Sequence, residues 1–232
     1  MKGSRLIFAL VTACYSTLGV AAQPAAPPFE QSLSTDRGTQ LLFQGFEVEL
    51  ALSAGPDHLR ADATVYVFGM RGYEKVKEGS NGFTCLVNRD GQQAGDRTLR
   101  PTCWDAEGGA TIVPVMLRVG ELLAQRKSAD EVRRDIDASF DKGRFSAPHK
   151  AGIAYMLRGD VQVDPDGRQV SGQSFPPHYM IYAPGVSNRD IGIGEGASRD
   201  QFALPFVYAG YSGGTRTGYI IVLATEGKGH VH

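Results

Sequence analysis

The sequence lacks the features that mark nucleic-acid-binding, membrane-spanning and disulfide-rich proteins. Its 24 basic residues are balanced by 25 acidic ones, so no basic excess indicates a nucleic-acid partner. No apolar run reaches the ~20 residues that a membrane-spanning helix needs. Three cysteines among 232 residues are too few for a small scaffold held by several disulfides. We therefore expect no nucleic-acid partner and no membrane span.

Complete catalytic and cofactor motifs are also missing. The glycine-rich run that begins at Ile191 resembles a phosphate-binding loop, but it lacks the lysine and the serine or threonine that such a loop needs. His230 and His232 could ligate copper, nickel or zinc, yet a structural zinc site usually has four ligands. The sequence thus names no cofactor, and metal binding at these two histidines is kept as one alternative function.

What the sequence does contain begins with an export signal. Residues 1–22 start with basic residues, continue through a short apolar stretch and end in small residues, which is typical of a secretory signal peptide. Residues 23–38 are rich in proline and alanine, and we expect a flexible leader there. A second interpretation places a lipid anchor on Cys14, although signal segments usually run about 15–30 residues. Both interpretations predict a periplasmic or secreted protein.

The remaining residues, 39–232, are predicted to form a single α+β domain. One helix is expected between residues 39 and 56. A second helix is expected to be capped by Thr111 and to carry Pro114 in its first turn. A third opens with a capping-box pattern at Ser128 and Glu131, where each residue's side chain bonds the backbone of the other.

Strands are expected on both sides of the second and third helices. Residues 64–68, 73–77 and 83–87 read as a meander, and the short turns between them favour antiparallel pairing. Further strands are expected at 153–158, from His178 onward and in a closing hairpin near the C-terminus. The order of strands, helices and strands predicts a mostly antiparallel sheet with a helical pair packed on one face.

The two later cysteines, Cys85 and Cys103, are predicted to form a disulfide. Export places them in an oxidising compartment, and an even pair remains when Cys14 leaves with the signal or is acylated. Strand alternation puts Cys85 on the same side as Phe83 and Val87, which is a core position. A structural disulfide is therefore favoured over a free, reactive thiol.

Two hydrolase readings compete with this interpretation. In the first, Cys85 is a nucleophile, His178 its base and Asp105 the group that orients the histidine. In the second, a cleft near His178, Asp105 and Glu107 carries the acid and base, because His178 begins an apolar strand where loops gather. Each residue also has a purely structural interpretation: His178 is bonded to a backbone carbonyl, and Asp105 caps a turn.

Four segments resemble a known set of sequences. The segments "NGFTCLV", "WDAEG", "GIAYML" and "PHYMIYAPG" are together similar to those of an uncharacterised group of exported bacterial proteins. The resemblance runs from about Thr64 to the final strand; it implies export and one domain, and no activity carries over. We therefore expect a non-enzymatic binding or envelope-associated protein whose partner is an unknown ligand or envelope component, with a hydrolase and a metal-binding protein as alternatives.

Overall fold

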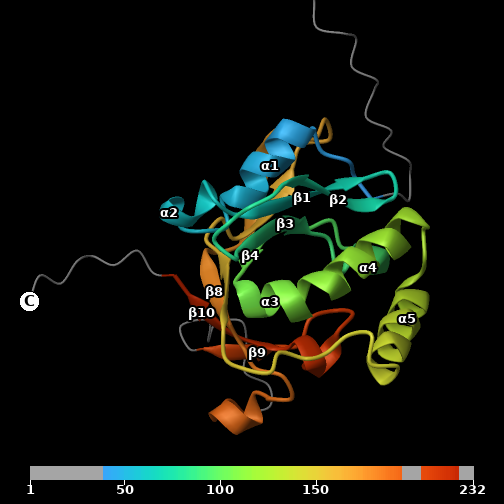
Figure 1. The fold of residues 1–232 in the computed structure, drawn as a ribbon, viewed down its shortest axis with the longest axis vertical. Helices are drawn as coiled ribbons and strands as arrows, with labels where there is room; N and C mark the ends of the chain where they lie inside the picture. Colours follow the sequence, from blue (N-terminus) through green and yellow to red (C-terminus); the bar gives the residue numbers. More distant parts are fainter. Residues whose placement is uncertain (1–38, 195–204, 225–232) are drawn as a thin grey trace, which may run out of the picture. The chain divides into compact units, whose positions relative to one another are not determined.

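The computed structural model describes residues 39–194 and 205–224. The expected signal peptide and leader, Cys14, His230 and His232 lie outside these residues. An eight-stranded sheet has the strand order β2-β1-β3-β4-β5-β8-β10-β9, and a two-stranded sheet has the order β6-β7 (Figure 1). The expected α+β architecture with a mostly antiparallel sheet is confirmed.

The bounds of the elements are as follows. The strands are β1 (Thr64–Gly69), β2 (Gly72–Lys77), β3 (Thr84–Asn88), β4 (Arg100–Trp104), β5 (Ile153–Met156), β6 (Asp160–Val163), β7 (Val170–Phe175), β8 (His178–Tyr182), β9 (Phe206–Tyr208) and β10 (Tyr219–Leu223). The helices are α1 (Gln44–Leu52), α2 (Asp57–Arg60), α3 (Ala106–Thr111), α4 (Val113–Ala124) and α5 (Ala129–Asp141). Short 3₁₀ turns are η1 (Gln92–Ala94), η2 (Arg189–Ile191) and η4 (Gly214–Thr217).

The large sheet is covered by helices on both faces: the predicted helical pair, α4 and α5, packs on one face, and α1 covers the other. Alternation along β3 sends Leu86 into a core that α4 and α5 complete. Cys85 and Val87 point the other way, into a second core beneath α1. Helix α1 therefore lies across the sheet from α3 and α4 (Figure 1). Burying both faces explains why β3 is apolar at successive positions.

Helix α5 forms as its sequence predicts. The Ser128 side chain accepts from the Glu131 backbone, and the Glu131 carboxylate accepts from the Ser128 backbone at 2.9 Å. Gly143 then ends the helix in the left-handed region, with φ of +69°. The expected cap of α4 is wrong, because Thr111 belongs to the preceding helix α3 and donates to Glu107 O.

The first three strands do not form a simple meander. Strand β1 lies between β2 and β3, pairs antiparallel with β2 and runs parallel to β3. No long crossover is required, because β2 already returns the chain to the end at which β1 began. The predicted antiparallel pairing of the second strand with the third is therefore wrong: β3 pairs parallel with β1 and antiparallel with β4.

The small sheet is joined to the large one near the start of β4. Leu99 and Val161 exchange two backbone hydrogen bonds, each of 2.9 Å. This bridge places Asp160, the first residue of β6, beside Arg100, the first residue of β4. At the far edge of the large sheet, β9 and β10 form the antiparallel closing hairpin that the sequence predicted.

Candidate functional site

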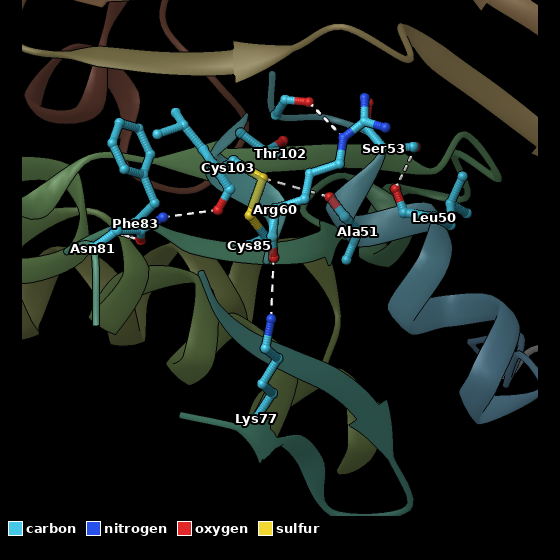
Figure 2. Close-up of a disulfide and its surroundings, with 12 residues drawn as sticks. Leu50, Ala51, Ser53, Arg60, Lys77, Asn81, Phe83, Cys85, Thr102 and Cys103 are labelled. Atoms are coloured by element: carbon cyan, nitrogen blue, oxygen red, sulfur yellow. Dashed lines mark hydrogen bonds between the residues drawn. A yellow bond between two sulfur atoms is a disulfide. The ribbon is translucent and has the colours of Figure 1, made fainter. Parts of the chain in front are cut away.

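The two cysteines form the predicted disulfide. Cys85 and Cys103 lie directly opposite each other on the antiparallel strands β3 and β4. Both are buried, with Ala51 of α1 and Arg60 of α2 around them (Figure 2). A bonded, buried sulfur cannot act as a nucleophile, so the reading of Cys85 as the nucleophile of a thiol hydrolase is wrong for this oxidised structure.

Asp105 holds three structural elements together. One carboxylate oxygen accepts from the Gly108 backbone at the start of α3 and from the Tyr182 hydroxyl at 2.7 Å. The other oxygen accepts from the Ile153 backbone at 2.8 Å. Asp105 therefore caps a helix and ties β4 to β5 and β8. These bonds match the structural reading of the aspartate and leave it little freedom to orient a histidine.

Glu107 and His178 are engaged elsewhere. The Glu107 carboxylate accepts from the His149 backbone at 2.7 Å. His178 is 2% exposed, its Nδ1 lies 2.8 Å from Pro176 O, and its ring meets Phe175 edge-on. Burial lowers the pKa of His178, although the carbonyl of Pro176 opposes this effect. The ring matches the reading of a histidine bonded to a backbone carbonyl.

The structure does not bring these sequence candidates together. His178 is the first residue of β8, while Tyr182, which bonds Asp105, is the last. Four residues of extended strand separate the two ends by about 13 Å, at ~3.3 Å per residue. His178 therefore lies at the opposite end of β8 from the tyrosine that bonds Asp105, so the two candidates are too far apart for a hydrogen bond.

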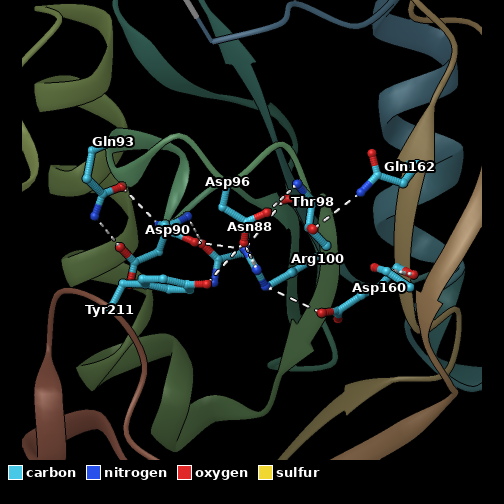
Figure 3. Close-up of polar contacts among 11 residues, drawn as sticks. Asn88, Asp90, Gln93, Asp96, Thr98, Arg100, Asp160, Gln162 and Tyr211 are labelled. Carbon is cyan, nitrogen blue, oxygen red and sulfur yellow. Dashed lines mark hydrogen bonds and ion pairs between the residues drawn. The ribbon is translucent and has the colours of Figure 1, made fainter.

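A different group of polar side chains gathers around Arg100, and we call it the Arg100 cluster: Asp90, Asp96, Arg100, Asp160 and Tyr211 (Figure 3). Arg100 opens β4, Asp160 opens β6, and Asp90 and Asp96 lie in the loop between β3 and β4. Tyr211 comes from the segment between β9 and β10. Three parts of the chain that are distant in sequence therefore meet here.

In the inner part of the cluster, the Asp90 carboxylate holds the loop between β3 and β4 against the segment between β9 and β10; we call these contacts the clasp on Asp90. Its carboxylate accepts from the Ser212 backbone at 3.0 Å, from the Ser212 hydroxyl at 2.5 Å and from Gln93 Nε2 at 3.0 Å. The Tyr211 ring lies over Gly91, where an added Cβ would approach the ring to 2.6 Å. The loop between β3 and β4 is thus fastened to the C-terminal hairpin.

The outer part of the cluster shares one guanidinium between two carboxylates. Arg100 Nη2 pairs with Asp96, and Arg100 Nε lies 3.5 Å from Asp160 Oδ2. The side chains of Asp96 and Asp160 are 24% and 18% exposed, so both carboxylates are partly accessible to a ligand. The Tyr211 hydroxyl donates to Asp96 at 3.1 Å, and Arg100 lies 5.2 Å from the centre of the Tyr211 ring.

These surroundings move the pKa values of the two carboxylates in opposite directions. Burial raises the pKa of Asp160 to about 6, because the attraction of Arg100 only partly offsets the loss of water. Hydrogen bonds from Arg100 and Thr98 outweigh burial at Asp96 and lower its pKa to about 2. Such divergent carboxylates are frequent at functional sites, and they are frequent in structural ion-pair networks as well.

An exposed aromatic surface adjoins the carboxylates. Tyr211 is 41% exposed, the largest exposure of any aromatic side chain of the cluster and its surroundings. Tyr208 packs edge-on against it with ring centres 6.4 Å apart. Burial raises the pKa of Tyr208, and burial with the neighbouring carboxylates raises that of Tyr211, so both phenols are neutral hydrogen-bonding groups.

Sequence reasoning missed this cluster. The loop "NRDGQQAGDRTLR" carries Asp90, Asp96 and Arg100, but these residues match no catalytic or binding motif. Asp160 and Tyr211 carry no local signal, because only the pairing of Leu99 with Val161 and the clasp on Asp90 bring them to Arg100. A useful signal was the excess of charged residues between two apolar strands.

Other binding features are sparse in the described part of the chain. A surface hollow of about 290 Å³ lies between α4 and α5, lined by Leu122, Lys127, Glu131, Arg134 and Asp135, none of which belongs to the Arg100 cluster. No group of three or more histidine, cysteine or acidic side chains in residues 39–194 and 205–224 is arranged to hold a metal ion. None of the helices within these ranges is long and apolar enough to cross a bilayer.

Comparisons of the chain with protein-family models, with curated proteins and with solved structures find no match. The resemblance to exported bacterial proteins therefore stays a prediction. Function has to be argued from the geometry of the site alone.

Proposed function

We propose that this chain is an exported, non-enzymatic binding protein and that the outer part of the Arg100 cluster is its binding surface. The observation that carries the proposal is the sharing of one guanidinium by two partly exposed carboxylates, Asp96 and Asp160. Arg100 can neutralise one of the two charges, so one negative charge is left over. The predicted signal peptide and the disulfide support export.

The chemistry of this surface favours a ligand that carries a positive charge. An ammonium group would be attracted to the carboxylates of Asp96 and Asp160, and it would offset the cost of keeping Asp160 ionised at neutral pH. The partly exposed Tyr211 adds an aromatic ring and a hydroxyl beside the carboxylates, and its ring already has Arg100 5.2 Å from its centre, within the range of a cation–π contact. A protonated amine of a small molecule or of an envelope component has this chemistry.

The hydrolase alternative has less support. Asp105 and Glu107 are occupied by backbone hydrogen bonds, and His178 lies at the other end of β8 from Asp105. The metal-binding alternative depended on His230 and His232, which lie outside the described residues. Neither alternative has a specific contact in its favour.

The proposal is tested by isothermal titration of the exported, oxidised protein with spermidine at low ionic strength. Its triacetylated form, which has the same chain without charge, is the matched neutral probe. We expect spermidine to bind and the neutral probe not to bind. Asp160→Asn is expected to weaken binding about tenfold or more, since a hydrogen bond to a charged group contributes roughly 1.5–3 kcal/mol. Tyr211→Ala is expected to weaken it about two- to fivefold, since an exposed aromatic contact with a cation contributes roughly 0.5–1 kcal/mol.

The matched control variant is Asp62→Asn, which removes the same charge from an exposed aspartate next to β1. It should leave the affinity for spermidine unchanged apart from a small effect of net charge. If the wild-type protein does not bind spermidine, the cationic ligand is wrong. If it binds but Asp160→Asn and Asp62→Asn have the same affinity, the ligand binds elsewhere on the chain.

A further inference from the structure

The large sheet opens between β1 and β3. These parallel strands are paired at only two positions, Thr64 with Thr84 and Val65 with Cys85. Immediately after Val65, the register of β1 against β2 shifts, because Val65 lies opposite Lys77 and Tyr66 lies opposite Lys75. Strand β2 therefore carries one extra residue there, as in a β-bulge, which increases the local twist of the pair. Beyond the bulge, the backbone groups that would join β1 to β3 need other partners.

Side chains replace the missing ladder in this opening. The Tyr73 hydroxyl donates to Val87 O of β3 at 2.8 Å and accepts from the backbone N–H of Arg89, the residue that follows β3, at 3.1 Å. The Glu47 carboxylate, from α1, accepts from Phe68 N of β1 at 3.1 Å. The opening is therefore lined by polar groups in the middle of an apolar sheet, and each of these backbone groups is satisfied.

The same opening holds a fully buried ion pair. Arg89 Nη2 donates to Glu47 Oε1 at 3.1 Å, and the two side chains are 0% and 1% exposed. The guanidinium lies 4.9 Å from the centre of the Phe68 ring. Burial is the largest influence on the Glu47 carboxyl and raises its pKa, which Arg89 only partly opposes. A buried pair contributes to stability only when its remaining polar atoms are also hydrogen-bonded.

Three polar atoms of this pair have no partner within the described protein. They are Arg89 Nε, Arg89 Nη1 and Glu47 Oε2. A buried polar atom without a hydrogen bond costs roughly 1–3 kcal/mol, and more when it is charged. Three such atoms on one ion pair are unusual, because every other buried side-chain nitrogen or oxygen in the described residues has a hydrogen-bond partner.

We propose that the opening between β1 and β3 is a binding site for internal water, held by Arg89 and Glu47. The unpartnered atoms select this ligand by their chemistry. Two are donors on a guanidinium and one is an acceptor on a carboxylate, and water can accept from the first and donate to the second. An anion would meet the Glu47 carboxylate and a cation would meet Arg89, so neither matches both sides of the site. Buried waters typically make about three hydrogen bonds of this kind.

The first experiment detects the water directly in the full-length wild-type protein. Cross-peaks between water and the Arg89 Hε proton are recorded by NOESY and ROESY on arginine-labelled protein. We expect cross-peaks of opposite sign in the two spectra, as a bound water that outlasts tumbling requires. Peaks of the same sign would report proton exchange instead, and peaks of the same sign or no peaks would overturn the proposal.

The second experiment removes the site. Glu47→Leu combined with Arg89→Met replaces the pair by apolar side chains of similar size, and oxygen-17 relaxation dispersion reports the number of long-lived waters. We expect the double variant to lose at least one such water. The control, Asp135→Leu with Arg118→Met, removes a partly exposed ion pair and should lose none. An equal number of waters in the Glu47 and Arg89 double variant and the wild type would overturn the proposal; if that variant does not fold, the wild-type spectra decide.

Discussion

Asp160 gives the sharpest test of the electrostatics of the Arg100 cluster. Its pKa is raised from 3.8 to about 6, chiefly by burial. An acid whose pKa is higher in the folded state binds its proton more tightly there than in the unfolded chain. Stability therefore falls as pH rises from about 4 to about 6, and the ionised carboxylate destabilises the fold at neutral pH. Asp160→Asn, which cannot ionise, should remove this loss.

The size of the effect follows from the difference in pKa. A change from 3.8 to about 6 corresponds to roughly 3 kcal/mol, at ~1.4 kcal/mol for each pKa unit. The Asp160 side chain is 18% exposed, so screening by solvent reduces this figure only modestly. We expect Asp160→Asn to be more stable than the wild type at pH 7 by up to about 3 kcal/mol, and the two proteins to converge below pH 4.

The measurement is urea unfolding of both proteins at several pH values between 3.5 and 8, a range chosen to bracket both pKa values (~4 and ~6). The difference between the two free energies of unfolding isolates Asp160, since other titrating groups cancel. Asp62→Asn serves as the control and should track the wild type throughout. A constant difference across the range, or a variant less stable than the wild type at pH 7, would show that Arg100 outweighs burial and would refute the reasoning.

Four further predictions follow from other parts of the fold. Replacing both cysteines by alanine should lower the free energy of unfolding by about 3 kcal/mol, as measured by urea denaturation, because the bond closes a loop of 18 residues' separation. Ser128→Ala should cost about 1 kcal/mol by the loss of the capping box, with Ser80→Ala as an exposed control. Gly91→Ala should lower the melting temperature clearly, because φ of +104° and the ring of Tyr211 both oppose a Cβ. Gly95→Ala has a similar φ but open space around its Cβ, so the difference between the two variants gives the contribution of the clash with Tyr211. Mass spectrometry of natively exported protein should find an N-terminus at Gln23 and a peptide linking Cys85 to Cys103; an intact N-terminus or free thiols would contradict export.

Local signals in the sequence were enough for most individual elements. Helix α5 was predictable because Ser128, Glu131 and Gly143 each act within a few residues of their own position. The disulfide was predictable because compartment and strand alternation gave the same answer. Thr111 misled the prediction, since α3 ends where α4 begins and a threonine suited to capping instead completes the first helix.

Non-local features were beyond the same reasoning. The place of β1 between β2 and β3 depends on side chains such as Tyr73 and Glu47 that satisfy an opened ladder, which no local pattern encodes. The Arg100 cluster depends on contacts such as that of Asp90 with Ser212, more than a hundred residues away. His178 was singled out by its place at the head of a strand, which is also where a buried histidine can bond a nearby carbonyl.

The disulfide also bears on the order in which the site can assemble. Cys85 and Cys103 bracket the loop that carries Asp90, Asp96 and Arg100, so the oxidised chain keeps these three residues in one small covalent ring even when it is unfolded. In the oxidised unfolded chain, bringing these three residues together costs less conformational entropy, because the disulfide has already closed the loop that carries them. A reduced chain has to find the same contacts from an open coil. Oxidation of the two cysteines would therefore prepare the Arg100 cluster as well as strengthen the sheet.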